Sequence, residues 1–175
     1  MDNIQLDFLV LIGPSGAGKS FIGKTAAASF DQFEFVDGEK YLIQKYGSVN
    51  DFIKVKTQAL KDLYHYIEEL AKKTDKTIIF EGIGLSDQSF IDYFQQTYHT
   101  LLIEVISSKE LCISQVSTRQ KGLNFRNENE YTEHFYDYWH QKIRPTLSFD
   151  LSIQNDHAAI EDIKKFFTNF LIKNP

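Results

Sequence analysis

The sequence predicts a three-layer α/β/α fold, in which helices cover both faces of a five-stranded parallel sheet. Three observations support this fold class. Short apolar segments alternate with helical patterns along the chain, which is typical of βαβ units. The strand segments are apolar on successive residues, as in strands that are buried on both faces. The chain has 175 residues, with no repeat or long linker, so we expect a single domain over 1–175.

The predicted strands end in residues that can bind ligands. These strands are residues 8–12, 33–37, 77–81, 101–106 and 148–153. The first runs directly into a glycine-rich loop, and two others end in Asp37 and Glu81. Because parallel strands end at the same edge of a sheet, we expect both carboxylates to lie near that loop.

The segments between the strands show the three- and four-residue spacing of amphipathic helices. The helices expected from this spacing cover residues 20–30, 38–46, 51–70, 88–98, 109–118, 130–143 and 160–171. Asp51 is expected to cap the third of them. The helix over 130–143 should end before Pro145, because the proline ring disfavours helical geometry at the preceding residue.

The glycine-rich loop has a phosphate-binding pattern. Gly13-Pro14-Ser15-Gly16-Ala17-Gly18-Lys19-Ser20 matches G-x-x-x-x-G-K-[ST] between a strand and a helix. Glycines let backbone N–H groups turn inward, and the helix N-terminus adds partial positive charge. We therefore predict an ATP-binding loop in which Lys19 reaches the β- and γ-phosphates and Ser20 binds Mg²⁺. The expected ATP contacts are Gly13, Ser15, Gly16, Ala17, Gly18, Lys19 and Ser20.

Composition excludes several other classes. The net charge of −5 argues against a surface that coats nucleic acid. The single Cys112 excludes an internal disulfide and suggests a reducing compartment. The sequence shows neither a signal-peptide pattern nor an apolar run long enough to cross a membrane. We therefore expect a cytoplasmic protein, either monomeric or homodimeric, with no nucleic-acid or membrane partner.

Beyond the loop, the order of elements resembles that of small P-loop kinases of the nucleoside/nucleotide kinase and shikimate kinase-like group. The segment from Phe35 to Gly47 resembles the part of shikimate kinases where two acids, two residues apart, follow the second strand. The resemblance implies that Asp37 lies near Mg²⁺ and that Glu39, in place of the usual Asp, faces the acceptor hydroxyl. It also implies an acceptor-side region at about 38–75.

The same resemblance suggests roles for three further segments. Gly82 and Gly84 lie where shikimate kinases have an acceptor loop. Residues 119–130 correspond to a lid, whose Arg119 and Arg126 would close over the γ-phosphate and stabilise charge in the transition state. Asn155 lies in a polar turn where related kinases contact the adenine.

The acceptor side shows a departure from these kinases. No arginine lies between residues 38 and 100, although a planar guanidinium is the usual clamp for a phosphate or carboxylate. We therefore predict transfer of the γ-phosphate of ATP to a small-molecule hydroxyl. A nucleoside monophosphate kinase and a catalytically silent ATP-binding regulatory domain are the alternatives. A GTPase is disfavoured, because the chain has no N-K-x-D segment.

The catalytic base stays open between three acids. Asp37 is the first choice, but a residue directly before a predicted helix can instead be its N-cap. Glu81 is the rival, because a carboxylate at the end of a buried strand needs water, a cation or a metal. Glu39 is the third candidate, although acids also favour helix N-termini for the dipole alone.

Overall fold

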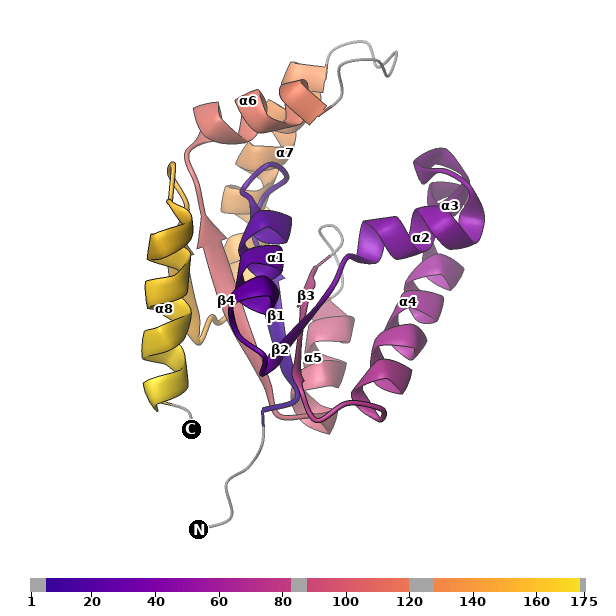
Figure 1. Cartoon of the computed structure of the whole chain (residues 1–175). Helices are drawn as coiled ribbons and strands as arrows, with labels where there is room; N and C mark the ends of the chain where they lie inside the picture. The colour runs from indigo at the N-terminus through magenta and orange to yellow at the C-terminus, as the bar shows by residue number, and fades with distance from the viewer. Residues whose placement is uncertain (1–5, 83–87, 120–127, 174–175) are drawn as a thin grey trace.

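The computed structural model describes residues 6–82, 88–119 and 128–173. Its strands form one parallel sheet in the order β2-β3-β1-β4-β5 (Figure 1). The strands are β1 (Phe8–Ile12), β2 (Phe33–Val36), β3 (Thr77–Glu81), β4 (Thr100–Ile106) and β5 (Leu151–Gln154). The predicted five-stranded α/β fold class is therefore confirmed.

Helices cover both faces of this sheet. The α-helices of the described chain are α1 (Lys19–Ser29), α2 (Gly38–Tyr46), α3 (Val49–Lys54), α4 (Lys56–Ala71), α5 (Gln88–Thr97), α6 (Lys109–Arg119), α7 (Glu128–Tyr138) and α8 (Ile160–Lys173). One buried cluster joins the sheet to α4 and α5, through residues such as Leu63 and Phe94. A second joins the opposite face to α1 and α8, through Ile22 and Phe167. Among the described helices, none has the length and apolar character needed to cross a membrane.

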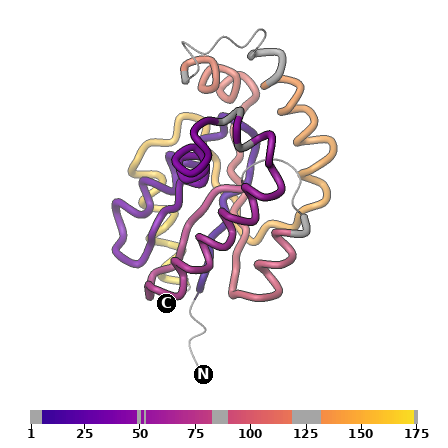
Figure 2. The backbone as a smooth tube through the Cα atoms, turned by 90° about the vertical axis from the view of Figure 1, so that its right-hand side faces the viewer, coloured from indigo at the N-terminus to yellow at the C-terminus, as the bar shows by residue number. Residues whose placement is uncertain are grey.

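The strands point their carboxyl ends toward one edge of the molecule. Figure 1 shows the loop between β1 and α1 at this edge, with α6 and α7 on one side and α2 and α3 on the other. The view turned by 90° places α6 above the sheet and α7 beside it (Figure 2). Topology alone thus places the expected acceptor side and helices α6 and α7 around the glycine-rich loop, while residues 120–127 of the expected lid lie outside the described residues.

The helix expected over 51–70 is two helices, which corrects the prediction for Asp51. Val55 has φ −119° and ψ 33°, outside helical geometry, and separates α3 from α4. Asp51 lies inside α3 rather than at its cap. Its backbone N–H donates to Ser48 Oγ at 3.2 Å, and Ser48 Oγ donates back to its carboxylate at 2.6 Å. The Ser48 hydroxyl therefore caps the first turn of α3 and is itself held by the Asp51 carboxylate.

The largest of the other differences from the expected boundaries are at the start of β5 and the end of α7. The strand expected from residue 148 starts at Leu151, because the Asp150 carboxylate accepts the N–H of Leu102 at 2.7 Å in place of a ladder bond. Helix α7 ends at Tyr138 and continues as a π turn (Trp139–Ile143) and a 3₁₀ turn (Arg144–Thr146). The helical path therefore changes geometry before Pro145 instead of stopping there, and it brings Arg144 onto the buried Glu104 of β4.

A carboxylate on α4 holds α2 in place. Asp62 accepts hydrogen bonds from Lys45 Nζ at 2.6 Å, from the Tyr46 hydroxyl at 2.7 Å and from Gln58 Nε2 at 2.7 Å. These three donors lower the pKa of Asp62 from its ordinary 3.8 to about 2. The two longer helices of the expected acceptor side are thus joined by a charged hydrogen-bond cluster.

This cluster predicts a defined acid sensitivity. Because the folded pKa of Asp62 lies below its unfolded value, the contact is fully stabilising above about pH 4 and is lost as the pH falls through about 2. We expect Asp62→Asn to remove the loss of stability that this contact causes as the pH falls from about 4 to about 2. A carboxyl-carbon NMR titration measures it directly, and a midpoint at the ordinary value of 3.8 would contradict the contact.

Candidate active site

Strand register brings the predicted acids to the glycine-rich loop. Val36 of β2 pairs with Phe80 of β3, so Asp37 and Glu81 follow at the ends of neighbouring strands. Glu81 in turn pairs with Leu11 of β1, two residues before the loop begins. Three segments that are distant in sequence therefore meet at the carboxyl edge of the sheet.

The loop over 13–20 has the shape of an anion cradle. Gly16 and Gly18 adopt φ of 81° and 89°, values that residues with a side chain rarely adopt. Gly18 is the N-cap of α1 and has no side-chain oxygen, so it leaves the first-turn N–H groups facing the loop. The Lys19 ammonium donates to the carbonyls of Gly13 and Pro14 at 2.9 Å each, which keeps its charge over the loop.

A residue from the other end of the chain supports this loop. Asn155, which is 4% exposed, donates from Nδ2 to the Ala17 carbonyl at 2.7 Å. A Cβ on Gly18 would lie 2.0 Å from the same nitrogen. Asn155, predicted as an adenine contact, therefore holds the loop backbone, and it also lines the pocket beside that loop.

Glu81 contacts the predicted magnesium residue. The Ser20 hydroxyl donates to Glu81 Oε1 at 2.9 Å, in a partly buried position. A hydroxyl and a carboxylate are oxygen ligands of the kind that Mg²⁺ uses together with nucleotide phosphates. The described residues contain no cluster of three His, Cys, Asp or Glu that could hold a metal without a nucleotide. The donors present thus fit a metal that arrives with phosphate.

Asp37 has different partners. Its Oδ2 lies 2.8 Å from Lys24 Nζ, and its Oδ1 accepts the backbone N–H of Lys40 at 3.1 Å. Burial alone would raise the pKa of Asp37, but these hydrogen bonds and the lysine charge hold the pKa below its ordinary value. Asp37 is therefore the N-cap of α2. The role of Lys24 could not be predicted from the sequence, because Lys24 lies on α1 and its partner Asp37 follows β2.

The remaining predicted residues are placed as follows. Ser15 is exposed in the loop, and Glu39 is exposed in the first turn of α2. Gly82 follows β3, and its N–H donates to the Leu11 carbonyl at 3.0 Å. Arg119 is the last residue of α6. Gly84 and Arg126 lie outside the described residues.

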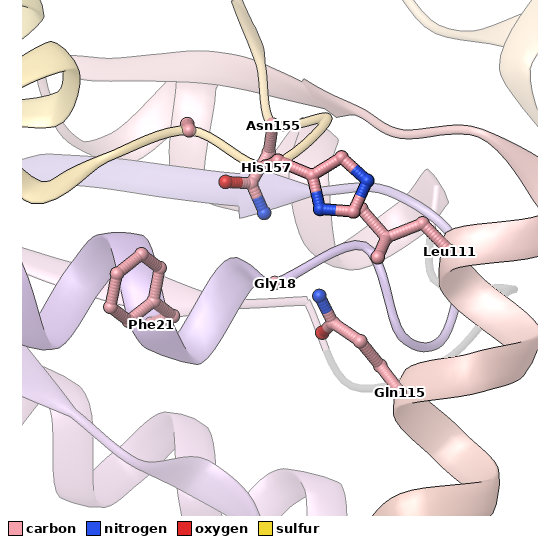
Figure 3. Close-up of a pocket in the computed structure, with 7 residues that line it drawn as sticks. Gly18, Phe21, Leu111, Gln115, Asn155 and His157 are labelled. Atoms are coloured by element: carbon pink, nitrogen blue, oxygen red, sulfur yellow. The ribbon is translucent and has the colours of Figure 1, made fainter.

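A pocket of about 350 Å³ opens beside the loop. Its lining residues are Gly18, Phe21, Leu111, Gln115, Asn155, His157 and Ala158. In Figure 3, Phe21 lies on one side of Gly18, while Leu111 and the Gln115 amide lie on the other. Apolar walls with a few amides suit a planar heteroaromatic ring. Sequence analysis pointed to Gly18 and to the polar turn 154–156, whereas Phe21 of α1 and Leu111 and Gln115 of α6 were not predicted to line a pocket.

Comparisons with known proteins support the fold. No protein-family model matches the sequence, and no curated protein matches it either. Shikimate kinase from Acinetobacter baumannii in complex with shikimate is 17% identical, with a TM-score of 0.71 over 98% of this chain and 96% of that chain. Shikimate kinase from Aquifex aeolicus is 16% identical, with a TM-score of 0.58 over 95% and 97%.

A nucleoside kinase has the same architecture. Deoxyadenosine kinase from M. mycoides with bound dATP is 18% identical, with a TM-score of 0.55 over 93% of this chain and 98% of that chain. At these identities the likeness concerns the fold, and it covers nearly the full length of each protein. The chain therefore has the fold of the small P-loop kinases of the shikimate kinase and nucleoside kinase group.

Proposed function

We propose that the protein is an ATP-dependent kinase that transfers the γ-phosphate of ATP to a hydroxyl of a small molecule. The Ser20–Glu81 contact carries this proposal, because it places an acid from a neighbouring strand against the phosphate-binding loop. The likeness in fold to shikimate and deoxyadenosine kinases agrees with it.

The donor side consists of the loop and the pocket beside it. The loop N–H groups and Lys19 bind the phosphates, and the pocket between Phe21 and Leu111 takes the adenine. Ser20 and Glu81 would hold Mg²⁺, which supplies charge neutralisation on the phosphates when it is bound. Glu81 is favoured over Asp37 as the metal carboxylate, because both oxygens of Asp37 already accept hydrogen bonds.

The acceptor side orients the hydroxyl for in-line attack. A bond forms between the acceptor oxygen and the γ-phosphorus as the bond to the bridging oxygen of ADP breaks. Glu39, in the first turn of α2, is the base that takes the hydroxyl proton. Arg119 and Arg126 from the lid stabilise negative charge on the moving phosphoryl group. The absence of arginine from 38–100 favours an acceptor without a clamped anion.

The direct test is transfer of label from γ-labelled ATP to a panel of nucleosides, sugars, small alcohols and shikimate. We expect a labelled product with a neutral hydroxyl compound. ATP binding without labelled product from any acceptor class would overturn the kinase proposal in favour of a silent nucleotide-binding domain. Tight binding of shikimate or of a nucleoside monophosphate would contradict the proposed acceptor class.

The metal assignment makes its own prediction. Glu81→Gln is expected to weaken Mg²⁺-dependent ATP binding by about 10–100-fold, because the amide keeps the shape but loses the charge. Calorimetric titrations with and without Mg²⁺ measure this difference. Glu161→Gln, on the exposed first turn of α8, is the matched control and should bind like the unchanged protein. An unchanged Mg²⁺ dependence in Glu81→Gln would remove Glu81 from the metal site.

A further inference from the structure

Lys24 joins the phosphate-binding helix α1 to the end of β2. Its Nζ lies 5.9 Å from the centroid of the Phe35 ring and reaches Asp37 Oδ2 at 2.8 Å. The adjacent residue of α1 is Gly23, where a Cβ would lie 2.3 Å from the Phe35 ring. Helix α1 therefore packs closely against β2 at the turn that carries Lys24.

The carboxylate that Lys24 contacts also starts α2. Asp37 Oδ1 accepts the N–H of Lys40, and the Asp37 carbonyl accepts the N–H of Tyr41 at 3.0 Å. The side chain of Asp37 is 23% exposed, whereas that of Lys24 is 59% exposed. One half-buried carboxylate thus links the donor helix on one side to the first turn of the acceptor helix on the other.

We propose that Lys24 is a positioning residue that holds Asp37 as the N-cap of α2 and so sets the place of Glu39 relative to the phosphate-binding loop. The proposal rests on the proposed function and deepens it, because it assigns the two strand-end acids different tasks. Glu81 serves the metal, and Asp37 serves the orientation of the acceptor helix.

Asp37 and Glu81 differ in the charge of the groups that contact their carboxylates. The negative charge of Asp37 is compensated by an ammonium at hydrogen-bond distance, which lowers its attraction for a second cation. Glu81 accepts from the hydroxyl of Ser20, a neutral partner that brings no positive charge to the carboxylate. Each oxygen of Asp37 also has a donor, so a metal at Asp37 would compete with the cap and the ion pair for the same carboxylate.

The test compares Lys24→Met with Lys24→Arg, and uses Lys72→Met as the matched control. Lys72 forms an exposed ion pair with Glu69 at the end of α4, away from α1 and α2. In Lys24→Met we expect the pKa of Asp37 to rise and the Lys40 amide to exchange about threefold faster or more, because a less ordered cap protects it less. Lys24→Arg should restore both readouts, and Lys72→Met should change neither.

Asp37→Asn separates positioning from metal binding, since asparagine caps helices as well as aspartate but carries no charge. Calorimetry with Mg²⁺ and a non-hydrolysable ATP analogue should show an affinity within about twofold of the unchanged protein, against the 10–100-fold loss for Glu81→Gln. A comparable loss in Asp37→Asn would make Asp37 a metal ligand and overturn the proposal. An unchanged Asp37 pKa in Lys24→Met would also overturn it.

These measurements do not depend on the acceptor. If Lys24→Met does not fold, the titration of Asp37 in the unchanged protein and in Lys24→Arg still tests the ion pair. A pKa of Asp37 at its ordinary value in both would contradict it. Failure of the proposed kinase function would instead appear as missing phosphoryl transfer in the unchanged protein, so the two failures can be distinguished.

Discussion

Replacement of Lys19 by methionine is expected to lower the turnover of phosphoryl transfer by about 10²–10³-fold, the usual cost of losing one preorganised donor to the transition state. The Lys19 ammonium is held over the loop by the carbonyls of Gly13 and Pro14. Methionine has a similar length and no charge, so it removes the electrostatic contribution while keeping most of the packing. The loop backbone should stay closed, because Asn155 supports it independently of Lys19.

Labelled-phosphate transfer at saturating ATP measures this effect, and thermal unfolding shows whether the variant is folded. Lys165→Met, at an exposed position of α8, is the matched control and should transfer phosphate at the unchanged rate. A folded Lys19→Met variant with full turnover would show that the ammonium takes no part in the reaction.

Gly16→Ala is expected to lower the free energy of unfolding by about 3 kcal/mol or more, from backbone strain and overpacking together. Gly16 has a φ of 81°, which a residue with a Cβ adopts at a cost. The added Cβ would also lie 2.3 Å from the Cys112 carbonyl oxygen and 2.9 Å from the Cys112 Cα. These are backbone atoms of α6 and cannot turn aside, so the loop itself must move.

Gly47→Ala separates the cost of backbone strain from the cost of overpacking. Gly47 also has a positive φ, of 97°, but the nearest atom to its added Cβ is Asp51 Oδ2 at 3.8 Å. Gly47→Ala therefore introduces backbone strain without a steric clash. We expect it to lower the free energy of unfolding by about 1–2 kcal/mol. Denaturant unfolding of both variants measures the difference. Equal losses would show that the contact between the loop and α6 is looser than the structure indicates.

Local patterns predicted the parts of the fold that depend on few residues. The loop over 13–20 was predictable, because its glycines, lysine and serine act within one turn of chain. The strand β3 and the helix α2 start and end at the predicted residues, because burial and the Gly47 break are local signals. The boundaries that differ were decided by side chains that compete with the backbone, such as Ser48 at α3 and Asp150 before β5.

The contacts that give the candidate site its chemistry could not be predicted from spacing. Ser20 and Glu81 are 61 positions apart, and Asn155 supports Ala17 across 138 positions. Asp37 illustrates the limit: the sequence left open whether it serves a metal, an acceptor or a helix cap. Its cap is a local contact that the sequence offered as one alternative. Its ion pair with Lys24 forms only when α1 packs against β2.

The sequence by itself determined that this chain forms an α/β sheet with a glycine-rich loop after the first strand, because periodicity and glycine spacing act over a few neighbouring residues. The tertiary structure alone decided which carboxylate meets Ser20 and which meets Lys24. That choice depends on the strand order β2-β3-β1, which places Glu81 beside the loop and Asp37 one strand further away. Contacts between residues so far apart in the chain depend on sheet topology and packing. A local sequence pattern carries no information about either.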